Sequence, residues 1–148
     1  MAKNKKPAKK YRPREVLQDP VHYVLQGFRP LTDIREADVP LRVRNHLALE
    51  ALMQGRATMG DLGTLITASN VVMALKSQGF GEDCCAIALA GADALEALQA
   101  RGRLVGTGPE LVAIKRMMEL HDAQLDRTRI TDLDAAVRLV RKKEAILV

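Results

Sequence analysis

Seven Lys and Arg residues, and no acidic residue, lie within the first fourteen positions of this 148-residue chain. They are Lys3, Lys5, Lys6, Lys9, Lys10, Arg12 and Arg14, and Tyr11 lies among them. Clustered cations bind the phosphates of DNA or RNA with release of counterions, and an aromatic ring can stack on a base. The chemistry that this segment supports is therefore the binding of a polyanion.

This segment accounts for the whole net positive charge. The chain has 23 basic and 18 acidic residues, whereas residues 15–148 contain 16 basic and 18 acidic ones. The favoured partner is the phosphate backbone of DNA or RNA. An acidic surface on a host or phage protein is the alternative, and a solubility tail without a partner stays open. A membrane is not expected, because the segment has no apolar anchor beside its charges.

A second group of cations lies near the C-terminus. The spacing of Arg138, Arg141 and Lys142 puts all three on one face of a predicted helix. One explanation is a favourable interaction with the helix dipole, because cations stabilise the last turn of a helix. The other is that this face extends the nucleic-acid-binding surface of the N-terminal segment.

Three polar residues interrupt the apolar stripes of predicted helices: Asn45, Asn70 and His121. Each side chain is expected to point at least partly into the bundle, where an unpaired polar group costs about 1–3 kcal/mol. The favoured interpretation is a buried polar network that fixes the register of the helices. The alternative is a ligand or proton-transfer site built on His46, His121 and Asp122.

No residue spacing matches a catalytic or metal-binding motif. The three histidines lie in separate predicted segments, and neither CxxC nor HExxH occurs. Cys84 and Cys85 are adjacent and are expected to pack as small apolar groups, which fits a reducing cytoplasm. The glycine-rich stretch 102–108 matches no phosphate-binding loop. We therefore expect no catalytic residues, no metal and no cofactor in a cytoplasmic protein.

The elements that position these residues are all predicted to be helices. The chain has no Trp, two Phe and two Tyr, and its apolar residues are mostly Leu, Ala, Val, Ile and Met. This composition favours an all-α fold over a sheet. We expect a disordered basic arm at residues 1–18 and one helical domain at 19–148, a bundle of about five to six antiparallel helices. The expected helices span roughly residues 19–27, 40–54, 58–78, 82–101, 107–125 and 131–144.

Local signals mark several helix ends. Thr58 with Asp61, and Thr107 with Glu110, are spaced as capping boxes, and Thr131 is expected to cap the last helix. Phe80, between two glycines, is expected to pin the junction of two helices. The C-terminal Ile146-Leu147-Val148 is left open between fraying, a short strand and docking on a neighbour.

The segment 82–101 is unusually rich in alanine. Ala86, Ala90, Ala94 and Ala97 form one stripe of the predicted helix. Such a stripe allows a neighbouring backbone to approach closely. The neighbour can belong to the same bundle or to a second copy in a homodimer, and the sequence does not choose between them.

Several sequence phrases, in order, resemble a group of small uncharacterised proteins carried by bacteriophages and prophages of Proteobacteria. These phrases are KKYRPR, Asp19-Pro20 with YVLQGF, Arg44-Asn45-His46, and HDAQLD at residues 121–126. The resemblance implies a cytoplasmic accessory protein that acts in infected or lysogenic bacterial cells. It implies no particular fold, reaction or site.

Taken together, these patterns favour a non-enzymatic accessory protein that associates with nucleic acid through its basic arm with low sequence specificity. The alternative is an adaptor or inhibitor that binds a host or phage protein through its nearly neutral helical body. A third hypothesis, an enzyme or small-ligand sensor, would use His46 and His121.

Overall fold

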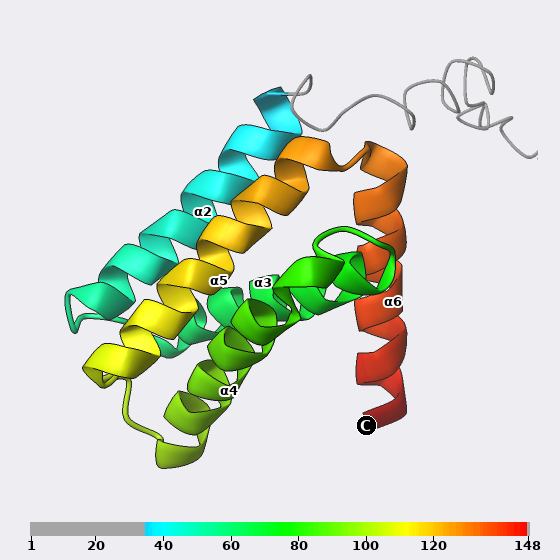
Figure 1. Cartoon of the computed structure of the whole chain (residues 1–148). Coiled ribbons are helices and arrows are strands. Elements are labelled where there is room, and N and C mark those ends of the chain that lie inside the picture. Colours follow the sequence, from blue (N-terminus) through cyan, green and yellow to red (C-terminus); the bar gives the residue numbers. More distant parts are fainter. Residues whose placement is uncertain (1–34, 148) are drawn as a thin grey trace, which may run out of the picture.

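Helices make up nearly all of the residues 35–147 that this computed structural model describes (Figure 1). In chain order they are α2 (Arg35–Met53), α3 (Met59–Ser77), the 3-10 turn η2 (Glu82–Cys84), α4 (Cys85–Arg101), α5 (Gly108–Arg127) and α6 (Ile130–Leu147). No strand occurs within these residues, so the prediction of an all-α bundle is confirmed. The predicted arm 1–18, with its seven cations and Tyr11, and the predicted helix 19–27 lie outside the described residues.

Helix α3 lies at the centre of the bundle and contacts α2, α4, α5 and α6. Its sequence explains this position, because its charged residues, Asp61 and Lys76, lie near its two ends. A helix that is apolar on most sides is stable only when neighbours cover it. The predicted capping box is present: the Asp61 N–H donates to Thr58 Oγ1 at 3.3 Å, and the Thr58 N–H donates to Asp61 Oδ2 at 2.8 Å.

Helices α2 to α5 enclose the larger of two apolar cores, which we call the main core. It includes fully buried side chains from α3, α4 and α5, among them Leu65, Val72, Leu95, Leu98, Ile114, Met117 and Met118. Helices α4 and α5 form an antiparallel hairpin in which the two helices approach most closely at Gly91. A Cβ on Gly91 would lie 2.4 Å from the Cβ of Met117, so only glycine fits there.

The Ala-rich helix is closely packed, as predicted, but the predicted stripe is only partly buried. Ala94 is buried and Ala97 is half-buried, whereas Ala86 and Ala90 are exposed. The reason is that α4 has apolar or small residues on several faces. Leu95 and Leu98, which bury more area than alanine, turn inward together with Gly91, while Leu89 stays exposed.

Helix α6 packs against the C-terminal half of α3 and forms a smaller core, which we call the α6 core. Its buried residues are Val71, Ala74, Leu75, Ala136 and Val140. Phe80, in the turn between α3 and η2, packs against this cluster, so it joins helices as predicted. In Figure 1, α6 runs across the direction of the other helices at one end of the bundle.

The hairpin loop between α4 and α5 is fixed by a charged side chain. Glu110 accepts hydrogen bonds from the Arg101 guanidinium at 2.7 and 2.6 Å and from the Thr107 N–H at 2.9 Å. These contacts, the Arg101 bonds first, lower the pKa of Glu110 to about 2. The carboxylate therefore stays ionised and holds the start of α5 against the end of α4.

Three predicted helix boundaries are wrong, one in α2 and two in α6. Helix α2 begins at Arg35, so that Pro40, predicted to open the helix, lies inside it. Helix α6 begins at Ile130, before the predicted cap Thr131, because Asp132 Oδ2 accepts a hydrogen bond from the Arg129 N–H at 2.8 Å. It continues through Leu147, so Ile146 and Leu147 belong to the helix and form no strand, while Val148 lies outside the described residues.

Candidate functional site

The outer face of α6 carries a cluster of cations, and we call it the α6 basic face. Arg138, Arg141 and Lys142 are all exposed, and they lie on the side of α6 opposite the buried Ala136 and Val140. The predicted clustering of these three side chains is thus present in the structure. Among the described residues, α6 packs through its inner face, and its outer face carries the exposed cations.

Arg138 forms one ion pair on this face, with Nη2 2.7 Å from Asp134 Oδ2 in the preceding turn. Both side chains are mostly exposed, and ion pairs of this kind contribute about 0.2–1 kcal/mol. A phosphate can therefore replace Asp134 as the partner of Arg138 at small cost.

The position at which α6 ends bears on the two explanations for these cations, which are interaction with the helix dipole and extension of the nucleic-acid-binding surface. Because the helix continues to Leu147, its last turn contains no basic residue. The helix dipole acts mainly within the last turn, so it does not account well for Arg138 or Arg141. Across residues 35–147, fifteen basic and fifteen acidic side chains give no net charge. The run 138–143, with four basic and no acidic residues, stands out against this background.

A second polar cluster joins α2 to α5 at the surface. His46 Nε2 lies 2.7 Å from Asp122 Oδ2, and Arg42 Nη2 donates to Asp126 Oδ1 at 2.8 Å. The structure therefore brings together two members of the alternative site, His46 and Asp122. His46 is exposed, whereas His121 is buried.

His121 belongs to the interior rather than to that surface pair. Its Nδ1 lies 3.4 Å from Oε1 of Gln124, and burial lowers the pKa of the imidazole, which favours its neutral form. The two histidines therefore face different environments, one at the surface and one in the interior. Within the described residues, no three His, Cys, Asp or Glu side chains are placed to hold a metal ion.

The expected burial is confirmed for Asn45 and His121, but Asn70 is exposed, so its predicted burial is wrong. Asn70 lies with Gly63 and Thr67 on an exposed stripe of α3 that none of the described helices covers. The apolar residues that flank it in the sequence mark the edge of the buried face rather than its centre.

Gln124 is a buried polar residue that the sequence interpretation missed. Its Nε2 donates hydrogen bonds to the carbonyl oxygens of Val72 at 3.1 Å and Phe80 at 2.9 Å. These bonds connect α5 to α3 and to the turn that follows α3. The sequence does contain a signal for the burial of Gln124, because this residue lies seven residues after Met117 and three after His121, on the same helical stripe.

The two cysteines are free and half-buried at the start of α4. Cys85 Sγ accepts a hydrogen bond from Lys76 Nζ at 2.8 Å. This contact joins the end of α3 to the start of α4, so Cys85 also forms a polar contact that the expected apolar packing did not include.

Comparisons of the chain with protein-family models, with curated proteins and with solved structures each find no match. Among the described helices, none combines the length and the apolar character that a membrane span requires.

Proposed function

We propose that the protein is a non-enzymatic phage or prophage accessory protein that binds the phosphate backbone of DNA or RNA. Binding involves the basic N-terminal segment together with the α6 basic face. The observation that carries the proposal is the placement of Arg138, Arg141 and Lys142. They are exposed on one face of α6 and precede its last turn.

The chemistry of this face favours phosphate over base recognition. Arg138 and Lys142 are four residues apart, about 6 Å along the helix axis, so they can contact separate phosphate groups. An arginine can also bind one phosphate through two parallel hydrogen bonds. Phosphate contacts fix the position of a protein on nucleic acid but carry no base information, so we expect low sequence specificity.

Binding should therefore depend strongly on salt. We would measure the affinity of the full-length protein for a duplex DNA and for a single-stranded RNA by fluorescence anisotropy over a series of salt concentrations. Each phosphate contact to duplex DNA adds about 0.9 to the slope of log K against log salt concentration. The variant R138A/R141A/K142A should lose about 2–3 from this slope if each cation contacts one phosphate.

The matched control is R44A/R103A/K115A, which removes the same charge from three exposed positions on α2, the α4–α5 loop and α5. This control variant should keep most of the slope of log K against log salt concentration. Equal weakening by the two triple variants would contradict a role for the α6 basic face. Replacing the seven Lys and Arg residues of positions 3–14 by glutamine tests the N-terminal segment in the same way, and binding independent of salt would overturn the whole proposal.

A second candidate function is that of an adaptor or inhibitor of another protein. The observation in its favour is that Val43 and Leu47 are exposed one helical turn apart on α2. Capture of the protein's partners from a bacterial extract after nuclease treatment separates the two functions. A stoichiometric protein that is lost with V43K/L47K, but retained with R138A/R141A/K142A, would favour the adaptor.

A further inference from the structure

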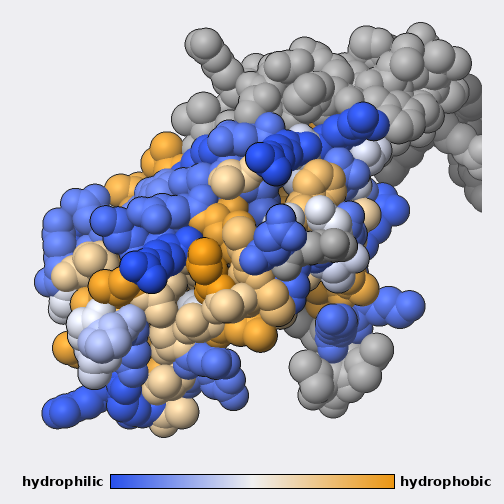
Figure 2. All heavy atoms as spheres, in the orientation of Figure 1, coloured by the Kyte–Doolittle hydropathy of each residue, from blue (hydrophilic) through white to orange (hydrophobic). Residues whose placement is uncertain are grey.

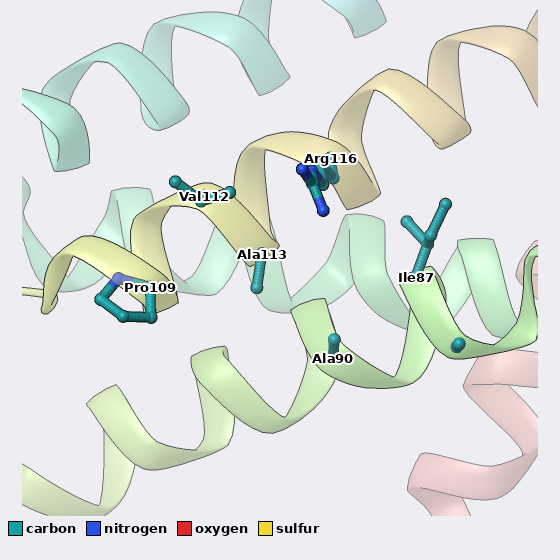
Figure 3. A pocket seen from close by; sticks show the side chains of 7 residues that line it. Ile87, Ala90, Pro109, Val112, Ala113 and Arg116 are labelled. Atoms are coloured by element: carbon teal, nitrogen blue, oxygen red, sulfur yellow. The ribbon is translucent and has the colours of Figure 1, made fainter.

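An apolar groove of about 370 Å³ runs between α4 and α5 (Figure 3). Its apolar lining consists of Ala86, Ile87 and Ala90 from α4 and Pro109, Val112 and Ala113 from α5. Ile87 and Val112 are 38% and 49% exposed, and together with the alanines they form a continuous apolar patch. Figure 2 shows hydrophobic side chains gathered along this part of the surface.

The groove also contains one cation. Arg116 of α5 lines it, and Asp93 of α4 is exposed one turn beyond Ala90, at the rim of the same face. No ion pair joins either side chain to the residues that the structure describes. The face therefore presents an apolar centre flanked by one basic and one acidic group.

The register of the hairpin puts these two charges at the same level. Gly91 of α4 lies against Met117 of α5, so Asp93 and Arg116 lie within about one helical turn of each other along the hairpin. A two-fold axis that runs along the groove, parallel to the two helices, would place α5 of each copy over α4 of the other at the same level along the hairpin. Arg116 of one copy would then face Asp93 of the second copy, and the same pair would form twice.

We propose that this groove is the interface of a homodimer, in which α4 and α5 of two copies pack around a two-fold axis with reciprocal Arg116–Asp93 ion pairs. A two-fold interface uses the same patch on both subunits, so the patch must be complementary to itself. The small side chains of Ala86, Ala90 and Ala113 let the helices of the second copy approach closely. The charges are also self-complementary, because the basic Arg116 of each copy faces the acidic Asp93 of the other. A second copy therefore fits this groove better than an unrelated protein.

This inference does not depend on the proposed function, because the interface lies on α4 and α5 rather than on α6. If both hold, a dimer carries two α6 basic faces and two N-terminal segments, which raises avidity for a long polyanion without any new contact.

The test uses the full-length protein without nucleic acid. Sedimentation velocity over roughly 1–100 μM, in moderate salt, should show a monomer–dimer equilibrium; a dissociation constant of about 1 μM corresponds to about 8 kcal/mol. R116D and D93R should each weaken dimerisation at least tenfold by creating reciprocal like-charge pairs. The double variant R116D/D93R should restore dimerisation to within about threefold, because it exchanges the two charges without changing their complementarity.

The control is K115D/E96R, which reverses two exposed charges on the same helices outside the groove lining. It should dimerise like the unmodified protein. Circular dichroism checks that each variant keeps its helices. V112K blocks the groove without changing either member of the Arg116–Asp93 pair. A protein that is monomeric at every concentration, or a double variant no better than the single ones, would overturn the proposal.

Discussion

The two cores of the molecule differ in what they bury. The main core, among α2 to α5, includes the polar side chains His121 and Gln124 beside its leucines and methionines. The buried residues of the α6 core are aliphatic or small, such as Leu75 and Val140, and Phe80 packs against them. Where four helices must align, buried hydrogen bonds help to fix their register. Where one helix lies on another, apolar contact supplies most of the packing, and the outer face of α6 carries exposed cations.

Two matched leucines test whether the main core and the α6 core unfold independently, and their replacement should have the largest effect. Leu65 and Leu75 are both fully buried on α3, the first in the main core and the second in the α6 core. Replacing either by alanine should lower the free energy of unfolding by about 2–5 kcal/mol. L65A should speed amide hydrogen exchange throughout the bundle, whereas L75A should speed it most in α6. If α6 exchanges together with α2 to α5 in L75A, the two cores form one cooperative unit.

Gln124 offers a second, smaller perturbation because it connects the two cores. Q124L would remove the donor to the Val72 carbonyl in the main core and to the Phe80 carbonyl beside the α6 core. The Val72 carbonyl keeps its partner within α3, but the Phe80 carbonyl would lose this donor. A buried carbonyl left unpaired costs about 1–3 kcal/mol, so we expect a loss of about 1–3 kcal/mol in urea unfolding. Q99L, at an exposed glutamine of α4, should change stability by less than about 0.5 kcal/mol.

These residues also show why the sequence predicted some features and not others. The capping box of Thr58 and Asp61 was predictable because it involves residues three apart, whose contact depends on local geometry alone. The cap of α6 was predicted at Thr131 and lies two residues earlier, at Arg129, so this local signal was also placed nearly correctly. Asn70 was misjudged because its spacing from Ile66 and Met73 cannot distinguish the centre of a buried face from its edge. Only the positions of the other helices decide that.

The inward face of α4 and the position of the α6 basic face also depend on more than local spacing in the sequence. Alanines on several sides of α4 gave more than one plausible buried stripe, and the close contact of Gly91 with Met117 depends on a helix that lies elsewhere in the sequence. The clustering of Arg138, Arg141 and Lys142 followed from their spacing. Their distance from the helix end did not, because the helix was expected to stop near Glu144 and instead includes Leu147.

A third prediction concerns pH, because the main core buries a titratable group. Burial lowers the pKa of His121 below its usual 6.5, so the folded protein holds the imidazole neutral while the unfolded chain takes up a proton. Stability should therefore fall as the pH is lowered below about 6.5, with a slope of up to about 1.4 kcal/mol per pH unit. Urea unfolding between pH 7 and 5.5 measures this slope. H121Q should reduce it, and an unchanged slope would show that another group is responsible.

The smallest predicted effects compare two exposed acids that each pair with an arginine. Asp126 pairs with Arg42 across α2 and α5, and Asp134 pairs with Arg138 on α6; the two acidic side chains are 62% and 55% exposed. Exposed pairs contribute about 0.2–1 kcal/mol, so D126N and D134N should each change stability by less than about 1 kcal/mol.

Their effects on nucleic-acid binding should differ, although both variants remove one negative charge. D134N releases Arg138 for a phosphate and should strengthen DNA binding roughly 1.5- to 5-fold at low salt, the equivalent of one exposed ion pair. D126N lies on the α2–α5 surface and should change binding less. Anisotropy titrations of both variants at the same salt concentration measure this difference. Equal gains would mean that binding responds to net charge alone, whereas a gain confined to D134N would locate the phosphate contact on α6.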